Sequence, residues 1–173
     1  MLKKICLITG GARSGKSSFA EKRANDVAGK RAYIATAQAL DVEMAARIEK
    51  HKQDRSDVWD TFEEPIAAPE VLKNLRSRYD VVVLDCLTLW LSNVMALSPD
   101  DQFVLARCAA LVDAVKEFDG ICIIVSNEVG LGIVPENQLA RKFRDFAGTL
   151  NQMMAQAADE VYFTAVGIPL KLK

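Results

Sequence analysis

Short apolar runs alternate with longer amphipathic segments along the 173 residues of the chain. The runs within residues 79–85 and 121–126 are continuously apolar, which is typical of strands that helices cover on both faces of a parallel sheet. Other strand-like segments are shorter or alternate between apolar and polar residues. Together these patterns predict strands at residues 5–9, 31–36, 59–62, 79–85, 121–126, 161–166 and 168–172.

Segments with an apolar residue every three or four positions separate the predicted strands. They predict helices over residues 18–28, 42–55, about 71–75, 87–95, from 99 onward and 139–154. Gly29 is expected to cap the end of the first helix. Asp41 is expected to cap the start of the second, and Ser98 the start of the helix that opens with Pro99.

A glycine-rich segment lies between the first predicted strand and the first predicted helix. Its spacing, a glycine, four residues and then Gly-Lys-Ser, matches the phosphate-binding P-loop in the strand-to-helix context which that motif requires. Glycines let backbone N–H groups approach phosphate oxygens at the positive end of the helix. The sequence therefore predicts a nucleoside triphosphate site at Gly10, Gly11, Ala12, Arg13, Ser14, Gly15, Lys16 and Ser17.

Mg²⁺ is expected beside this loop. Lys16 is placed to reach the β and γ phosphates, and the Ser17 hydroxyl to contact a bridging Mg²⁺. Asp85 ends the most apolar predicted strand, where a P-loop protein places its second contact to the metal, directly or through water. The alternative for Asp85 is a polar strand end without a metal role.

Strands and helices alternate from end to end, and no internal repeat or long linker interrupts them. This order predicts an α/β fold, a three-layer sandwich of the P-loop NTPase type around a mostly parallel sheet. The Gly-Ile-Pro segment at residues 167–169 is expected to form the turn between the last two strands, which would make them an antiparallel hairpin. We expect a single P-loop kinase or nucleotidyltransferase domain over residues 1–173.

Composition narrows the function classes further. A net charge of −1 argues against a general attraction to nucleic acid or to an anionic membrane. The four cysteines are scattered in apolar segments without metal-binding spacing, as expected for buried thiols in a reducing compartment. No stretch is apolar enough for membrane insertion or for a signal peptide. These features predict a cytoplasmic protein that binds small molecules.

A P-loop in one small domain is compatible with a small-molecule kinase, a GTPase-like switch or an ATP-driven motor module. The guanine-specific Asn-Lys-x-Asp pattern is missing, which favours phosphoryl transfer to a small molecule. His51 is either a solvated surface histidine or a nucleophile. In the second case, neighbouring cations favour its neutral form, and Lys52 or Arg55 helps to neutralise the phosphorus atom that it attacks. Asn127 and Glu128 belong either to a ligand-binding loop or to a tight structural turn.

Several separated segments resemble one family. They are the P-loop, residues 45–52 (AARIEKHK), Trp59, residues 63–65, residues 85–93 (DCLTLWLSN), residues 126–135 (SNEVGLGIVP) and residues 167–170. In this order they resemble the bifunctional adenosylcobinamide kinases / adenosylcobinamide-phosphate guanylyltransferases. The resemblance covers nearly the whole chain.

The resemblance implies two reactions. A nucleoside triphosphate, ATP or GTP, phosphorylates adenosylcobinamide, and GMP from GTP then passes through a guanylylated histidine to adenosylcobinamide phosphate. The carrier histidine corresponds to His51, with Lys16 as the second catalytic residue. The family also implies a homotrimer. Residues expected near GTP are Ile34, Ala35, Thr36, Lys52, Gln53, Asp54, Arg55, Glu63 and Asp85.

Two alternatives to the bifunctional enzyme stay open at this point. One is a P-loop small-molecule kinase with a single activity. The other is a non-catalytic module that senses GTP without turnover. Steady release of ADP or pyrophosphate in the presence of cobinamide would exclude the sensing module.

Overall fold

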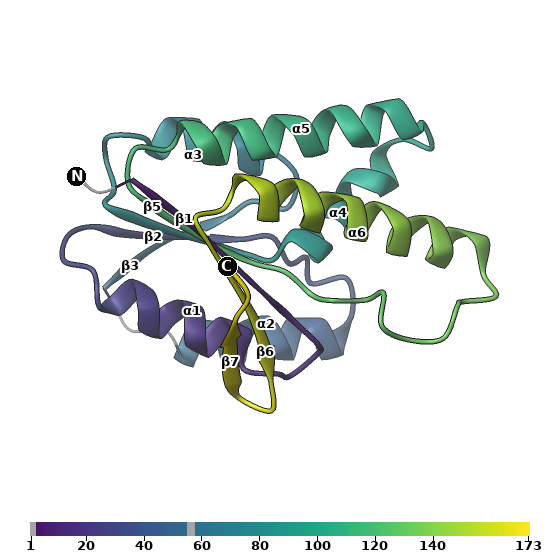
Figure 1. Cartoon of the computed structure of the whole chain (residues 1–173), viewed down its shortest axis with the longest axis horizontal. Helices are drawn as coiled ribbons and strands as arrows, with labels where there is room; N and C mark the ends of the chain where they lie inside the picture. Colours follow the sequence, from purple (N-terminus) through teal and green to yellow (C-terminus); the bar gives the residue numbers. More distant parts are fainter. Residues whose placement is uncertain (1–2, 55–57) are drawn as a thin grey trace.

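The computed structural model describes residues 3–54 and 58–173; the side chains of Arg47 and of residues 50–54 are outside the description. Seven strands of the described chain form one sheet in the order β3-β2-β4-β5-β1-β6-β7 (Figure 1). All neighbouring strands are parallel except the antiparallel pair β6 and β7. The strands are β1 (Lys4–Gly10), β2 (Arg31–Ala35), β3 (Trp59–Glu63), β4 (Val81–Asp85), β5 (Ile121–Val125), β6 (Glu160–Ala165) and β7 (Ile168–Lys171).

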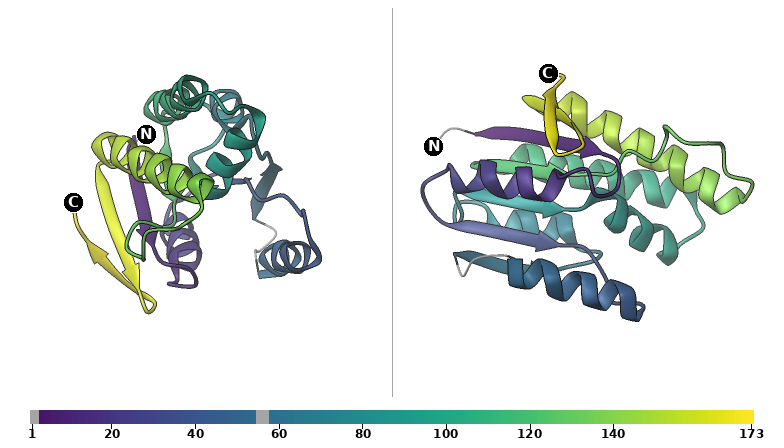
Figure 2. Two further views of the ribbon diagram at one scale, coloured as in Figure 1. Left: turned by 90° about the vertical axis from the view of Figure 1, so that its right-hand side faces the viewer. Right: turned by 90° about the horizontal axis from the view of Figure 1, so that it is seen from below.

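Helices cover the sheet on both faces, which completes the three-layer α/β sandwich that the sequence predicts (Figures 1 and 2). One face packs against α3 (Ala68–Leu75), α4 (Leu87–Leu97), α5 (Asp101–Glu117) and α6 (Gln138–Ala157). The other face packs against α1 (Lys16–Asn25). Helix α2 (Val42–Asp54) lies on the α1 side but stands apart from it, beyond the β3 edge of the sheet (Figure 2).

The core confirms that the two continuously apolar runs are strands covered by helices on both faces. Residues 81–84 of β4 are fully buried, and β5 is buried from Cys122 onward, because each strand has helices over both of its faces. β4 lies between β2 and β5, and β1 lies between β5 and β6. The carboxyl ends of β1, β2 and β4 therefore meet at one edge of the sheet, where parallel sheets bind ligands. No helix of the described chain is both long and apolar enough to cross a membrane.

Three local predictions were wrong. Helix α1 ends at Asn25, and Gly29 has φ +114° in the following turn, where a Cβ would collide with Asp80. Asp100 rather than Ser98 caps α5, since its carboxylate accepts a hydrogen bond from the backbone N–H of Gln102 at 3.0 Å.

The turn of the C-terminal hairpin was also misplaced. Val166 and Gly167 form it, with φ +48° and +83°, as a two-residue turn of type I′ requires. Ile168 and Pro169 already belong to β7. The antiparallel pairing of β6 with β7 itself is confirmed.

Candidate active site

The glycine-rich loop connects the buried strand β1 directly to α1, as the P-loop motif requires (Figure 1). Gly15 stands at the N-cap of α1 with φ +93°, a conformation that favours glycine, and its carbonyl accepts a hydrogen bond from Phe19 N–H at 3.0 Å. The backbone N–H groups of the first turn of α1 thus remain available at its positive end. This is the local geometry that binds phosphate.

The first glycine of the motif is required by the neighbouring strand. A Cβ atom on Gly10, whose φ is +149°, would lie 2.4 Å from the carbonyl oxygen of Thr164 in β6. A Cβ atom on Gly11 would have no neighbouring atom within 4 Å. Gly10 therefore allows β6 to approach the start of the loop, whereas Gly11 faces open space.

Lys16 lies at the base of the loop and is 7 % exposed. Its Nζ donates a hydrogen bond to the carbonyl oxygen of Gly11 at 2.5 Å. This contact folds the ammonium group back over the loop, whose residues Ala12 to Ser17 line the cleft. Lys16 is thus positioned to neutralise phosphate charge at this point.

A hydroxyl group at the end of the loop meets a carboxylate at the end of β4. Asp85 Oδ2 accepts a hydrogen bond from Ser17 Oγ at 2.8 Å and another from the Tyr33 hydroxyl at 2.6 Å. Among the described residues, no group of three or more His, Cys, Asp and Glu side chains forms a metal cage. A Mg²⁺ ion needs no such cage, because it commonly takes one or two protein oxygens together with substrate phosphates and water. The Ser17–Asp85 pair fits that requirement.

A cleft of about 900 Å³ opens over these groups. One wall is the P-loop and the start of α1, and the floor includes Tyr33, Ala35 and Asp85 at the ends of β2 and β4. Glu63 and Pro65 line it from the end of β3. The volume is within the range of small-molecule sites.

Helix α2 supplies another part of the lining through Met44 and Ile48. Asp41 caps this helix as predicted, because its Oδ1 accepts a hydrogen bond from Met44 N–H at 2.7 Å. The backbone of His51 lies in the last turn of α2, with Lys52, Gln53 and Asp54 after it. Arg55 lies outside the described residues.

Two of the residues expected near GTP have buried side chains. Ile34 is fully buried in the core. Thr36 is also fully buried, and its hydroxyl donates to the carbonyl oxygen of Cys86 and accepts from Cys86 N–H, both at 2.8 Å. Neither residue lines the cleft, although Ala35 between them does. Thr36 instead joins the ends of β2 and β4.

The loop after β5 contributes Asn127, whose Nδ2 donates to Thr88 Oγ1 at 2.8 Å beside the cleft. The backbone N–H of Glu128 donates to the carbonyl oxygen of Gly10 at 3.0 Å and so ties the loop to the P-loop. The carboxylate of Glu128 accepts a hydrogen bond from Gly130 N–H at 2.7 Å. Asn127 is therefore a cleft residue, and the Glu128 side chain stabilises a turn.

Sequence reasoning missed Tyr33 and Cys86 in the cleft lining. The sequence predicts the strand that carries Tyr33, but not that the tyrosine hydroxyl reaches Asp85 at the end of β4. Burial raises the pKa of the Cys86 thiol to about 11, and the nearby charge of Asp85 acts in the same direction. Cys86 is consequently a protonated thiol at neutral pH and a poor nucleophile.

The comparisons with known proteins agree over almost the whole chain. The model of the family described as "Cobinamide kinase / cobinamide phosphate guanyltransferase" matches residues 6–172. The chain is 44 % identical over 167 residues to the bifunctional adenosylcobalamin biosynthesis protein CobP of Pseudomonas aeruginosa, covering 96 % of both chains. It is 42 % identical over 181 residues to the protein of the same description, CobU, from Escherichia coli, covering 98 % and 99 % of the two chains.

Solved structures of low sequence identity share the fold. A type III secretion system ATPase of pathogenic bacteria aligns with a TM-score of 0.63 at 9 % identity, over 98 % of this chain and 57 % of that one. The RadB recombinase aligns with a TM-score of 0.56 at 12 % identity, over 93 % and 74 %. These likenesses establish a P-loop NTPase-like α/β fold.

Proposed function

The chain belongs to the cobinamide kinase / cobinamide phosphate guanyltransferase family, and we propose that it catalyses both reactions in adenosylcobalamin biosynthesis. The observation that carries this proposal is the single cleft shared by the P-loop and α2. The P-loop binds the triphosphate that both reactions consume. Helix α2 includes His51 and lines this cleft through Met44 and Ile48, so we infer that His51 reaches the same triphosphate.

In the first reaction, the hydroxyl oxygen of adenosylcobinamide attacks the γ phosphorus of a nucleoside triphosphate, ATP or GTP. The bond from that phosphorus to the β–γ bridging oxygen breaks, the nucleoside diphosphate leaves, and the hydroxyl proton is released. Lys16 and the loop N–H groups stabilise the negative charge that moves onto the leaving diphosphate. Phosphorylated adenosylcobinamide is the product.

In the second reaction, a neutral imidazole nitrogen of His51 attacks the α phosphorus of GTP and pyrophosphate leaves. A phosphate oxygen of adenosylcobinamide phosphate then attacks the same phosphorus, the nitrogen–phosphorus bond breaks, and adenosylcobinamide-GDP forms. Position 51 follows Met44 by seven residues and Ile48 by three. This spacing supports the assignment, because such positions share one face of a helix, and Met44 and Ile48 line the cleft.

We assign Mg²⁺ to the Ser17–Asp85 pair. The ion would neutralise phosphate charge and orient the triphosphate for either attack. Ser17 Oγ is the direct ligand in this assignment, and Asp85, which also accepts from Tyr33, holds the hydroxyl or a water molecule in place. Glu63, Lys52, Gln53, Asp54 and Arg55 complete the proposed surroundings of GTP.

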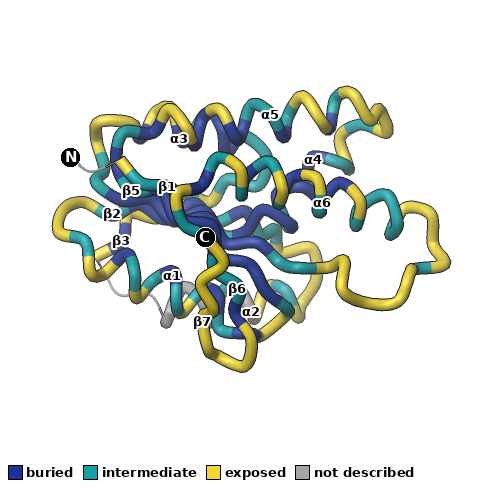
Figure 3. Tube along the Cα trace, viewed as in Figure 1, coloured by how far each residue is buried: buried dark blue, intermediate teal, exposed yellow. Residues whose placement is uncertain are grey.

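We further propose that three copies of the chain assemble in the cytoplasm. Apolar side chains on the edge strand β7 and its turn support an interface, since Val166 is 90 % exposed, Ile168 67 % and Leu170 61 %. Figure 3 shows the tube of β7 and this turn in the colour of exposed residues. The four free cysteines, all buried, support a reducing compartment. The net charge of −1 supports small-molecule substrates rather than nucleic acid.

The test is a two-stage assay with purified protein, Mg²⁺, adenosylcobinamide, and ATP or GTP. We expect phosphorylated adenosylcobinamide with either or both nucleotides, and adenosylcobinamide-GDP only when GTP is present. Lys16→Met should lower both rates by about 100-fold or more, whereas Lys73→Met on α3 should leave them unchanged. Formation of phosphorylated adenosylcobinamide without adenosylcobinamide-GDP would show that the protein is a kinase without guanylyltransferase activity. Binding of GTP without any product would support a sensing module.

A further inference from the structure

The C-terminal hairpin contacts the P-loop, although about 150 residues separate the two in the sequence. Ser14 Oγ and Thr164 Oγ1 are 2.8 Å apart, and both residues are buried, at 8 % and 1 % exposure. The backbone N–H of Gly167 donates to the carbonyl oxygen of Ser14 at 3.0 Å. The hairpin therefore binds the loop through one side chain and one backbone group.

The direction of the side-chain hydrogen bonds follows from a third contact. The Thr164 hydroxyl lies 3.2 Å from the carbonyl oxygen of Thr9 and donates to it, because a carbonyl can only accept. The single hydroxyl hydrogen of Thr164 is then used, so Ser14 must be the donor to Thr164 Oγ1. A chain of hydrogen bonds runs from the loop through Thr164 to the end of β1.

The backbones of the two segments also pack closely. β6 pairs with β1 in a register that places Thr164 opposite Gly10. A Cβ on Gly15 would lie 3.1 Å from the Cα of Gly167 in the hairpin turn. Gly10 and Gly15 of the motif thus lie against the hairpin.

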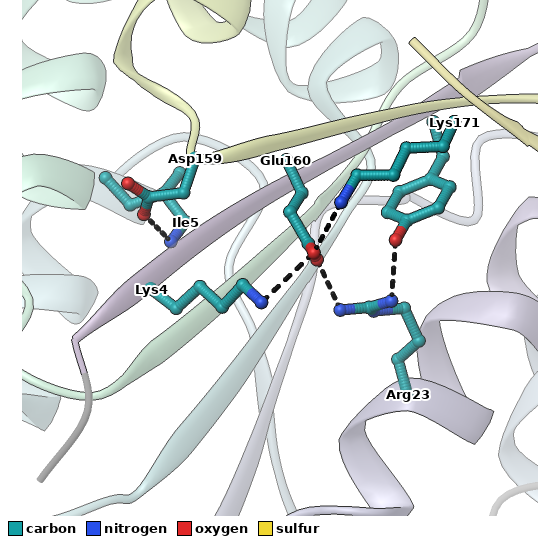
Figure 4. Close-up of polar contacts among 7 residues, drawn as sticks. Lys4, Ile5, Arg23, Asp159, Glu160 and Lys171 are labelled. Atoms are coloured by element: carbon teal, nitrogen blue, oxygen red, sulfur yellow. Dashed lines mark hydrogen bonds and ion pairs between the residues drawn. The ribbon is translucent and has the colours of Figure 1, made fainter. Parts of the chain in front are cut away.

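The other end of the hairpin is anchored by ion pairs (Figure 4). Glu160, at the start of β6, contacts Lys4 at 3.1 Å, Arg23 at 2.5 Å and Lys171 at 3.0 Å. These cations come from β1, α1 and β7. The ion pairs therefore connect β1 and α1, which flank the P-loop, to β6. The hairpin is held at both ends and forms a rigid backing for the loop.

We propose that Thr164 is a positioning residue for triphosphate binding, which acts by holding Ser14, and with it the P-loop backbone, in the conformation that receives phosphates. The inference rests on the proposed nucleotide site but not on either reaction. Phosphate binding by a loop depends on N–H groups that already point at the ligand. Loss of the Thr164 hydroxyl should free the loop without removing any group that touches phosphate.

The test measures the affinity for Mg²⁺ with inorganic tripolyphosphate by calorimetric titration, which requires no turnover. We expect Thr164→Val, which keeps the side-chain shape, to weaken this affinity about three- to tenfold, the factor typical of one or two lost hydrogen bonds. Ser14→Ala should do the same, and the double variant should be no weaker than either single variant. Thr164→Ser should restore wild-type affinity. The control is Thr149→Val, which removes an exposed hydroxyl bond to Asp145 on α6.

Unchanged affinity in Thr164→Val and Ser14→Ala, or fully additive losses in the double variant, would overturn the proposal. A loss that Thr164→Ser fails to restore would overturn it as well. If Thr164→Val does not fold, the other two single variants decide the question. Weaker tripolyphosphate binding by Ser14→Ala together with wild-type binding by Thr164→Ser supports the proposal, and any other result overturns it. Wild-type protein that binds tripolyphosphate but transfers no phosphoryl or guanylyl group would contradict the proposed function and leave this inference intact.

Discussion

Asp85 joins two hydroxyl groups from different elements, Ser17 at the start of α1 and Tyr33 in β2. Both donate to the same carboxylate oxygen, Oδ2. The position of the charge at the end of β4 could be predicted from the sequence. The tyrosine contact could not, because it depends on which strand lies beside β4.

Asp85→Asn should raise the Mg²⁺ concentration needed for half-maximal activity about tenfold or more, since groups that orient a metal ligand typically contribute 10–100-fold. The measurement is the rate of product formation against Mg²⁺ concentration at saturating GTP. Asp113→Asn, which alters an exposed carboxylate on α5, is the matched control. An identical Mg²⁺ dependence for Asp85→Asn and wild type would rule out the metal role.

The P-loop residues are the part of the site that sequence spacing predicts best. Lys16 and Ser17 lie where the motif requires, because strand, loop and helix are consecutive in the chain and need no long-range information. The resemblance predicts Ile34 and Thr36 near GTP, and this stays a prediction. Their segment borders the cleft through Ala35, and both side chains are fully buried.

At the scale of elements, the conformation of the P-loop depends on its neighbour β6. Gly10→Ala should lower the free energy of unfolding by roughly 2–4 kcal/mol, because the new Cβ overlaps the Thr164 carbonyl at a backbone conformation that favours glycine. Gly11→Ala is the matched control and should change it by less than about 0.5 kcal/mol. Urea unfolding monitored by circular dichroism compares the two. Equal stability of the two variants would mean that β6 does not constrain the loop.

Helix ends illustrate why element boundaries were harder to predict than the elements themselves. Ser98 and Asp100 are both good capping residues, two positions apart, and either pattern is compatible with the following apolar spacing. In the structure Ser98 Oγ accepts from Asp100 N–H, and Asp100 caps the helix. Which of the two residues caps the helix depends on the path of the chain from α4 into α5. The local sequence does not specify this path.

At the scale of the whole molecule, the alternation of strands and helices predicted the layers but not the strand order. β1 lies between β5 and β6, which are more than 100 residues away along the chain. Apolar periodicity reports that a strand is buried on both faces, and it carries no information on which strands are neighbours. The contacts of the hairpin with the P-loop were therefore not predictable from the sequence.

Glu160 ties β6 to three other elements, and its side chain is 13 % exposed. Burial alone would raise its pKa, but the hydrogen bonds from Lys171 and Lys4 and the charge of Arg23 outweigh burial and hold the pKa below its usual value of 4.5. A carboxylate with a lowered pKa stabilises the fold above its unfolded-state pKa, and this contribution is lost as the pH falls through the folded-state pKa.

Glu160→Gln should therefore lower the free energy of unfolding by about 1–3 kcal/mol at pH 7. The difference from wild type should shrink as the pH falls below 4.5. Denaturant unfolding at a series of pH values provides the measurement, with Glu117→Gln at the exposed end of α5 as the control. A difference that does not change with pH would show that the ion pairs are not its source.

The central claim is that His51 carries GMP, and covalent labelling tests it most directly. The protein is incubated with Mg²⁺ and GTP labelled at the α phosphate, denatured, and examined for label that remains on the chain and is released by acid. We predict acid-labile label on wild type and on Glu43→Ala, a change at the other end of α2, and none on His51→Ala. Absence of label on wild type under conditions where GTP binds, or label that persists in His51→Ala, would contradict the account.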